Sequence, residues 1–150
     1  MKKWNLIPIL ILVVLPSSRL WFEGSSTLHS FRADATTMNI SADQLTVPVA
    51  GLTSDIVGMD GPMRAALKIE RFPNILFKVI RRNMDVYGTL EIAGKKQTVT
   101  IPGQFSSESN RSRFTGSKEL LMTDFGIDPP TFFWVLNTDN KVVVYYDIIF

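Results

Sequence analysis

The segment from residue 86 to residue 105 constrains the fold most, because it has the pattern of a β-hairpin. Two runs rich in β-branched and apolar residues flank the tetrapeptide Ala-Gly-Lys-Lys at positions 93–96. With Gly94 as the first residue of a two-residue type II′ turn, Leu90 lies opposite Val99. One face of the hairpin is then apolar and carries Val86, Gly88, Leu90, Ile92, Val99 and Ile101. Since an isolated hairpin is only marginally stable in water, other elements must cover this face.

Alternating apolar and polar residues predict further strands on both sides of the hairpin. These strands are expected at residues 20–24, 25–34, 36–45, 75–80, 113–122 and 142–150. The segments at 47–58, 106–112 and 124–134 are predicted as an irregular connection, a polar turn and an aromatic-rich loop. About eight antiparallel strands joined by short turns favour an all-β barrel or sandwich over a parallel fold.

A single α-helix is predicted between the early strands and the hairpin. Asp60 suits the N-cap position, and the helix must end before Pro73. Met63, Ala66 and Leu67 form a narrow apolar stripe with the spacing i, i+3, i+4. Such a stripe fits a helix that lies across a sheet or over the mouth of a barrel.

The N-terminal residues have the pattern of a secretory signal peptide. Lys2 and Lys3 precede an apolar run at 6–15, which is too short to span a bilayer. Small residues follow, so cleavage is expected near Ser18. Residues 1–18 are therefore predicted to be a signal peptide and residues 19–150 a single exported domain without a stable membrane span. An uncleaved N-terminal anchor is the alternative.

Composition excludes several classes of function. Removal of residues 1–18 takes two lysines from the 16 basic residues and leaves 14 basic and 14 acidic residues. A neutral domain without a basic, aromatic-interleaved run is not expected to bind nucleic acid. The absence of cysteine excludes disulfide bonds and a thiol nucleophile. The sequence leaves the oligomeric state open.

His29 is the single histidine of the chain, so a histidine-based metal cluster is excluded. A hydrolase would have to use His29 with Ser26 or Ser30, but no nucleophile-elbow motif is present. We expect no catalytic residue, metal or cofactor, and we expect the His29 side chain to be hydrogen-bonded to a strand or loop carbonyl. A hydrolase remains an alternative of a different class.

Several short motifs follow one another in the order found in the YceI-like family, which the chain resembles from about residue 20 to residue 150. The motifs are Trp21 to Phe31, Pro48-Val49, Met59-Asp60 with Met63 and Ala66-Leu67, Phe72-Pro73-x-Ile75-x-Phe77, Tyr87-Gly88-x-Leu90-x-Ile92-x-Gly94 with Val99, and Thr123 to Ile127. The resemblance implies an exported bacterial domain with an extended lipocalin-like antiparallel β-barrel and one short inserted helix. In some members, the elongated interior holds an isoprenoid chain or a similar amphiphile.

On this basis the chain is expected to be a non-enzymatic protein that holds an isoprenoid or fatty-acyl amphiphile for carriage or sequestration. The residues expected to contact the ligand are Phe77, Leu90, Ile92, Val99, Ile101, Phe114, Leu120, Met122, Phe125, Val142 and Val144. The loop from Phe125 to Trp134 is expected to close one end. The alternative is an interaction module whose barrel is filled by side chains and whose exposed aromatic loop binds a partner.

Overall fold

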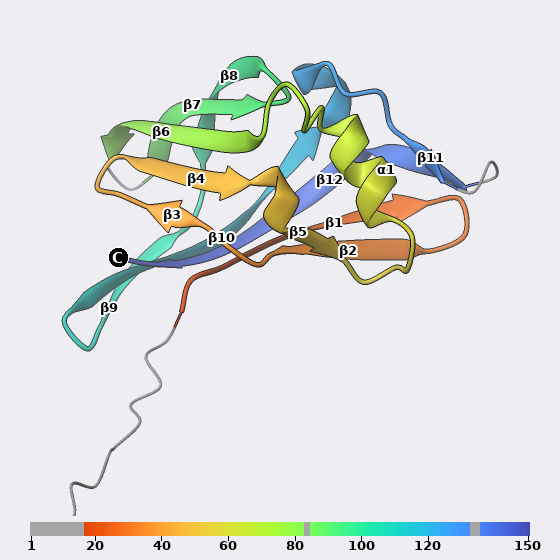
Figure 1. Cartoon of the computed structure of the whole chain (residues 1–150). Coiled ribbons are helices and arrows are strands. Elements are labelled where there is room, and N and C mark those ends of the chain that lie inside the picture. The colour runs from red at the N-terminus through yellow and green to blue at the C-terminus, as the bar shows by residue number, and fades with distance from the viewer. Residues whose placement is uncertain (1–16, 83–84, 133–135) are drawn as a thin grey trace, which may run out of the picture.

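The structure, a computed structural model, describes residues 17–82, 85–132 and 136–150 (Figure 1). In chain order its elements are β1 (Arg19–Ser26), β2 (Ser30–Ala35), β3 (Asn39–Ile40), β4 (Gln44–Pro48), η1 (Val49–Gly51), β5 (Leu52–Ser54), α1 (Asp60–Ala66), β6 (Asn74–Arg82), β7 (Val86–Ile92), β8 (Lys95–Ile101), β9 (Gln104–Glu108), β10 (Arg111–Leu121), η2 (Met122–Phe125), β11 (Thr131–Phe132) and β12 (Leu136–Ile149). Residues 1–16 of the predicted signal peptide and Trp134 of the predicted aromatic loop lie outside the described residues.

The strands form two antiparallel sheets that face each other across a common interior (Figure 1). The larger sheet has the order β5-β2-β1-β12-β10-β9, with β11 paired to β12, and the smaller sheet has the order β3-β4-β6-β7-β8. Within the described ranges, the chain passes between the sheets four times: between β2 and β3, at η1 between β4 and β5, through the segment that contains α1 between β5 and β6, and between β8 and β9. The predicted all-β antiparallel fold with one inserted helix is confirmed, and short strands such as β3, β5 and β11 raise the strand number above the expected eight.

The hairpin of β7 and β8 is confirmed, but its predicted register is wrong by two residues. Leu90 lies opposite Gln97 rather than Val99. The turn consists of Ala93 and Gly94, with φ angles of 51° and 80°, so it is a type I′ turn, which requires positive φ at both positions. Because side chains alternate with a period of two, a shift of two residues leaves every side chain on its predicted face.

Several predicted boundaries differ from the structure, and the strand predicted at 36–45 is divided between β3 and the start of β4. The polar turn expected at 106–112 is mostly strand, and only Ser109 and Asn110, both with positive φ, lie between β9 and β10. This hairpin projects beyond the body of the sheets (Figure 1), so solvent on both faces removes the hydrophobic alternation that marks a strand. The connection expected at 47–58 contains β5 and the end of β4, and β12 begins at Leu136 rather than Val142.

The predicted helix is confirmed as α1, but Asp60 is not its N-cap. Met59 occupies that position without a side-chain cap, and the carboxylate of Asp60 accepts a hydrogen bond of 2.7 Å from the backbone N–H of Ser54. This bond ties the first turn of α1 to β5. Met63 is buried against the core between helix and sheets, so the predicted apolar stripe faces inward. No described helix combines the length and the apolar character needed to cross a bilayer.

Asp147 on β12 forms an ion pair on the outer face of the larger sheet. Arg113 on β10 donates two hydrogen bonds to it, from Nε to Oδ1 at 2.7 Å and from Nη2 to Oδ2 at 2.6 Å. A nitrogen of Arg19 on β1 lies 3.9 Å from the same carboxylate. The hydrogen bonds from Arg113 lower the pKa of the Asp147 carboxyl below its ordinary value, although partial burial acts in the opposite direction.

We expect the protein to lose stability in acid as Asp147 takes up a proton. The pKa of this carboxyl is lower in the folded chain than in the unfolded chain. The ion pair therefore contributes fully to the free energy of unfolding above about pH 4, and this contribution is lost as the pH falls through the pKa of the folded chain. At neutral pH, Asp147→Asn should lower the free energy of unfolding by about 1–2 kcal/mol, measured by urea denaturation. The difference from wild type should shrink in acid.

Glu119→Gln is the control for this experiment. Glu119 pairs with Lys141 at 3.6 Å, but both side chains are more than half exposed. An ion pair in water contributes little, so this substitution should leave the unfolding curve unchanged. If the free energy of unfolding of Asp147→Asn stays below that of wild type by the same amount down to about pH 2, the assigned role of the carboxylate is contradicted.

Candidate ligand-binding cavity

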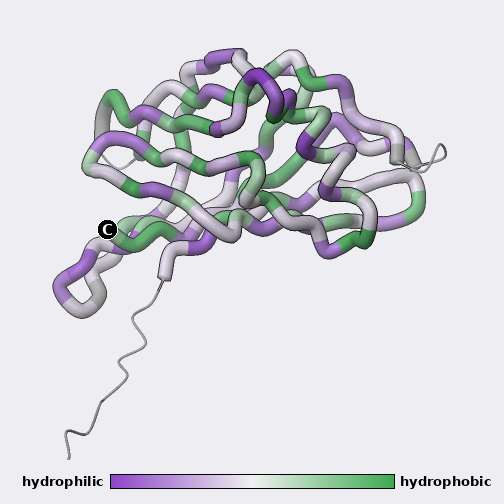
Figure 2. The backbone as a smooth tube through the Cα atoms, viewed as in Figure 1, coloured by the Kyte–Doolittle hydropathy of each residue, from purple (hydrophilic) through white to green (hydrophobic). Residues whose placement is uncertain are grey.

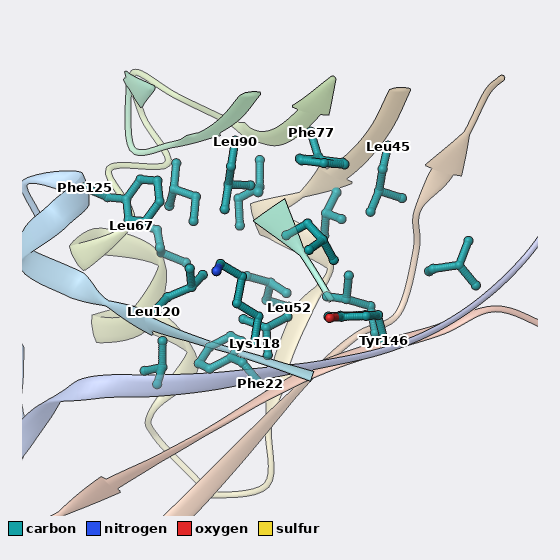
Figure 3. A pocket seen from close by; sticks show the side chains of 18 of the residues that line it. Phe22, Leu45, Leu52, Leu67, Phe77, Leu90, Lys118, Leu120, Phe125 and Tyr146 are labelled. Carbon is teal, nitrogen blue, oxygen red and sulfur yellow. The ribbon is translucent and has the colours of Figure 1, made fainter. Parts of the chain in front are cut away.

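An apolar cavity of about 260 Å³ lies between the two sheets (Figure 3). Both sheets, α1 and η2 contribute side chains to its lining. Apolar and polar residues alternate along the strands (Figure 2), so a strand presents one face to the cavity and the other to solvent. The register of the sheets therefore gathers apolar side chains from distant parts of the chain around one internal space.

One wall of the cavity is formed by β10 and β12. Residues two apart share a face of a strand, so the antiparallel register aligns the inner side chains of these strands in rows. The aligned pairs are Phe114 with Ile148, Gly116 with Tyr146, Lys118 with Val144, and Leu120 with Val142. The facing wall comes from β4, β6 and β7, which contribute Leu45, Phe77 and Leu90 (Figure 3).

Ten of the eleven residues predicted to contact a ligand line this cavity. They are Phe77, Leu90, Ile92, Ile101, Phe114, Leu120, Met122, Phe125, Val142 and Val144. Val99 is the exception, because it is half-buried beside the cavity and packs against the cluster that contains Leu90 and Phe125. The structure thus brings the predicted residues together, and their contact with a bound molecule stays a prediction.

Helix α1 and the segment after β10 cover one end of the cavity. Phe125 is 2% exposed, and it lies in one cluster with Ile127, Ala66 and Leu67. Pro130 from the same segment also lines the cavity. The described part of the loop predicted at 124–134 therefore contributes to this cover.

Aromatic side chains from β9, β10 and the C-terminal end of the chain line the other end of the cavity. Figure 1 marks the position of the C terminus. The rings of Phe114 and Tyr146 stack with centroids 5.6 Å apart, and Phe105 tilts against Phe114 at 4.6 Å. Phe105 and Phe150 are 42% and 45% exposed, so apolar surface continues from the cavity to solvent here. The Tyr146 hydroxyl donates to the carbonyl of Pro102, and burial raises its pKa to about 12, which keeps the phenol neutral.

Sequence analysis missed several residues of the lining. Phe22 and Phe31 come from β1 and β2. Leu20, Trp21 and Phe22 are consecutive apolar residues, and the apolar residues of 25–34 fall on both faces, so alternation did not define the inward face of either strand. Tyr146 was not predicted to contact the ligand, although the sequence pattern could have indicated it, because Tyr146 shares the predicted inward face of Val142 and Val144.

The structure corrects the expected environment of His29. Its side chain is exposed in the turn between β1 and β2, away from the cavity lining. Its backbone carbonyl accepts hydrogen bonds from the backbone N–H and the hydroxyl of Ser26, both at 2.9 Å, whereas its imidazole makes no hydrogen bond to the residues that the structure describes. Among those residues, no three histidine, aspartate or glutamate side chains are grouped so as to hold a metal ion.

Solved structures with the same fold include three bacterial proteins. BcnA from Burkholderia cenocepacia is 15% identical with a TM-score of 0.68, over 89% of this chain and 96% of BcnA. A polyisoprenoid-binding domain from Saccharophagus degradans is 16% identical with a TM-score of 0.62, over 88% of this chain and 92% of that domain. The YceI protein of Campylobacter jejuni is 12% identical with a TM-score of 0.59, over 80% of both chains.

Sequence comparison assigns the family directly. Curated proteins give no match to the sequence. Residues 18–150, however, match the YceI-like domain. This match spans the described sheets and the whole cavity, and it agrees with the shared fold. The predicted resemblance and its lipocalin-like architecture are therefore confirmed, and the chain belongs to the YceI-like family.

Proposed function

We propose that this protein is an exported, non-enzymatic binding protein that holds an apolar chain in the cavity between its sheets, for carriage or sequestration. The observation that supports this function is the cavity itself, which is lined almost entirely by apolar side chains. Removal of apolar surface from water would supply the affinity. The similar fold of the Saccharophagus degradans polyisoprenoid-binding domain supports an isoprenoid or fatty-acyl chain as the ligand.

The size of the cavity supports occupancy. At about 24 cal/mol per Å³, an empty cavity of 260 Å³ would cost roughly 6 kcal/mol. That cost is comparable with the roughly 5–15 kcal/mol that stabilises a whole domain. A bound chain would restore the missing van der Waals contacts, whereas water would find few polar partners among these side chains.

The two alternative functions receive less support. An interaction module with a filled barrel would need side chains in the space that the cavity occupies. A hydrolase would need His29 beside a substrate site, but this residue lies in an exposed turn.

The proposed periplasmic location rests on the N-terminal sequence, in which Lys2 and Lys3 precede an apolar run typical of a secretory signal.

Analysis of copurified lipid tests the proposal. The protein, expressed with its N-terminal segment in a bacterial host, is purified without detergent, extracted with organic solvent and analysed by mass spectrometry. We expect about one long-chain amphiphile per protein molecule. Matched column fractions from cells that lack the protein serve as the control. Absence of bound lipid, together with failure of the extracted protein to take up any long-chain amphiphile, would refute the proposed function.

A further inference from the structure

Lys118 is a charged residue on the inner wall of an otherwise apolar cavity. It lies on β10 opposite Val144, on the same strand face as Leu120. Figure 3 shows its side chain extending into the cavity, with the nitrogen inside the ring of apolar side chains. A lysine that merely covered apolar surface with its methylene groups would place its ammonium in water. The position of Lys118 therefore needs another explanation.

The ammonium of Lys118 has no acidic partner among the described residues. The neighbouring Glu119 points to the outer face of β10, where it pairs with Lys141 at 3.6 Å. Asp147 is also engaged outside, by Arg113 at 2.6 Å. Lys96, by contrast, lies 3.9 Å from Glu91. Within the described chain, Lys118 is the single charged residue of the cavity lining and makes no ion pair or hydrogen bond.

Lys118 is half-buried, and an unpaired ammonium among apolar side chains is solvated less well than one in water, which carries a cost in free energy. A ligand that brings a negative charge to this point would remove much of that cost. Charge-assisted hydrogen bonds from an ammonium to a carboxylate or phosphate are stronger than bonds between neutral groups. A neutral head such as an alcohol could accept a hydrogen bond from Lys118, but it would leave the charge of the ammonium unbalanced.

We propose that the ligand of this cavity is an amphiphile with an anionic head, a carboxylate or a phosphate, that pairs with Lys118 while its apolar chain lies along the remaining lining. This inference rests on the proposed function and specifies the chemical class of its ligand. The register places Lys118 near the middle of β12, whose 14 residues run the length of the cavity wall. The head would therefore lie inside the protein, and the chain would extend from it toward an end of the cavity.

Paired ligands that differ only in the head test this assignment. Delipidated protein is titrated by calorimetry with dodecanoate and dodecan-1-ol, and with farnesyl monophosphate and farnesol. We expect wild type to bind each anionic member at least about tenfold more tightly than its neutral partner. Lys118→Met should remove this preference by weakening the anionic ligands alone, whereas Lys118→Arg should retain it. Comparison of the preference for dodecanoate over dodecan-1-ol with the preference for farnesyl monophosphate over farnesol shows whether the site favours a carboxylate or a phosphate head.

Lys78→Met is the matched control, because Lys78 is exposed on the outer face of β6 and makes no contribution to the lining. It should keep the full preference for the anionic ligands. Equal affinity of wild type for both members of each pair would overturn this inference and leave the proposed function standing. An equal loss of affinity for all four ligands in Lys118→Met would also overturn this inference without affecting the proposed function. Circular dichroism would verify that this variant is folded. Binding of none of the four ligands to wild type would overturn the proposed function as well.

Discussion

Val144→Trp is expected to lower the affinity for an apolar chain by at least about a hundredfold, which corresponds to about 2.7 kcal/mol. Val144 lies near the middle of β12, opposite Phe22 on one neighbouring strand and Lys118 on the other. It is half-buried and lines the cavity. An indole at this position would occupy the space that the chain of a ligand needs. The loss can be measured by titration of the delipidated variant with dodecanoate.

The stability of Val144→Trp separates loss of the cavity from loss of the fold. Insertion of a larger side chain into a close-packed core typically costs about 1–3 kcal/mol. Here the added atoms enter a cavity of about 260 Å³ and gain contacts with its lining, so the free energy of unfolding should stay within about 1 kcal/mol of wild type or rise. Urea denaturation of the ligand-free proteins would measure this difference.

Val143→Trp provides the control, because the adjacent residue faces the opposite side of the same strand. Val143 lies opposite Glu23 and Glu119 on the outer face of the larger sheet. The same substitution there should leave ligand affinity unchanged. Wild-type affinity in a folded Val144→Trp variant would show that the ligand does not occupy this cavity. If the tryptophan variant fails to fold, Val144→Phe offers a smaller insertion with the same expected direction.

The hairpin shows which part of the fold can be predicted from sequence. Alternation in β7 and β8 determined the inward face correctly, although the turn was assigned one residue too late along the chain. Ala93 adopts a φ of 51°, which is unfavourable for a residue with a Cβ atom, and this made a turn beginning at Gly94 look preferable. Because side chains alternate with a period of two, the register error of two residues did not change the face assigned to any side chain.

The cavity was predictable where strands alternate regularly and not elsewhere. Regular strands gave Leu120, Val142 and Val144, whereas the consecutive apolar residues Leu20, Trp21 and Phe22 left the inward face of β1 undefined. The alternation also placed Lys118 on an inward face. Only the structure, however, shows that its nitrogen stays within the cavity (Figure 3) and that no described acid compensates it. Those two facts depend on contacts between distant strands, which local pattern does not encode.

Leu52→Ala is expected to destabilise the protein by about 3 kcal/mol, within the range of about 2–5 kcal/mol found for such substitutions. Leu52 is 1% exposed on β5 and packs with Val47, Val49 and Met63. It therefore joins the helix to both sheets. Urea denaturation of the ligand-free protein measures the loss. Val57→Ala is the control, because Val57 is 94% exposed and its truncation should change stability by less than about 0.5 kcal/mol.

Leu52 also lines the cavity, so the effect of its truncation should depend on the ligand. The space left by the missing methyl groups of Leu52→Ala would join the existing cavity, and a flexible chain could extend into it. A ligand at about a hundred times its Kd stabilises wild type by about 2.7 kcal/mol. If the chain fills the enlarged space, the deficit of Leu52→Ala should be smaller with a saturating long-chain ligand than without one. An undiminished deficit across ligands of increasing chain length would show that the bound chain does not reach this part of the cavity.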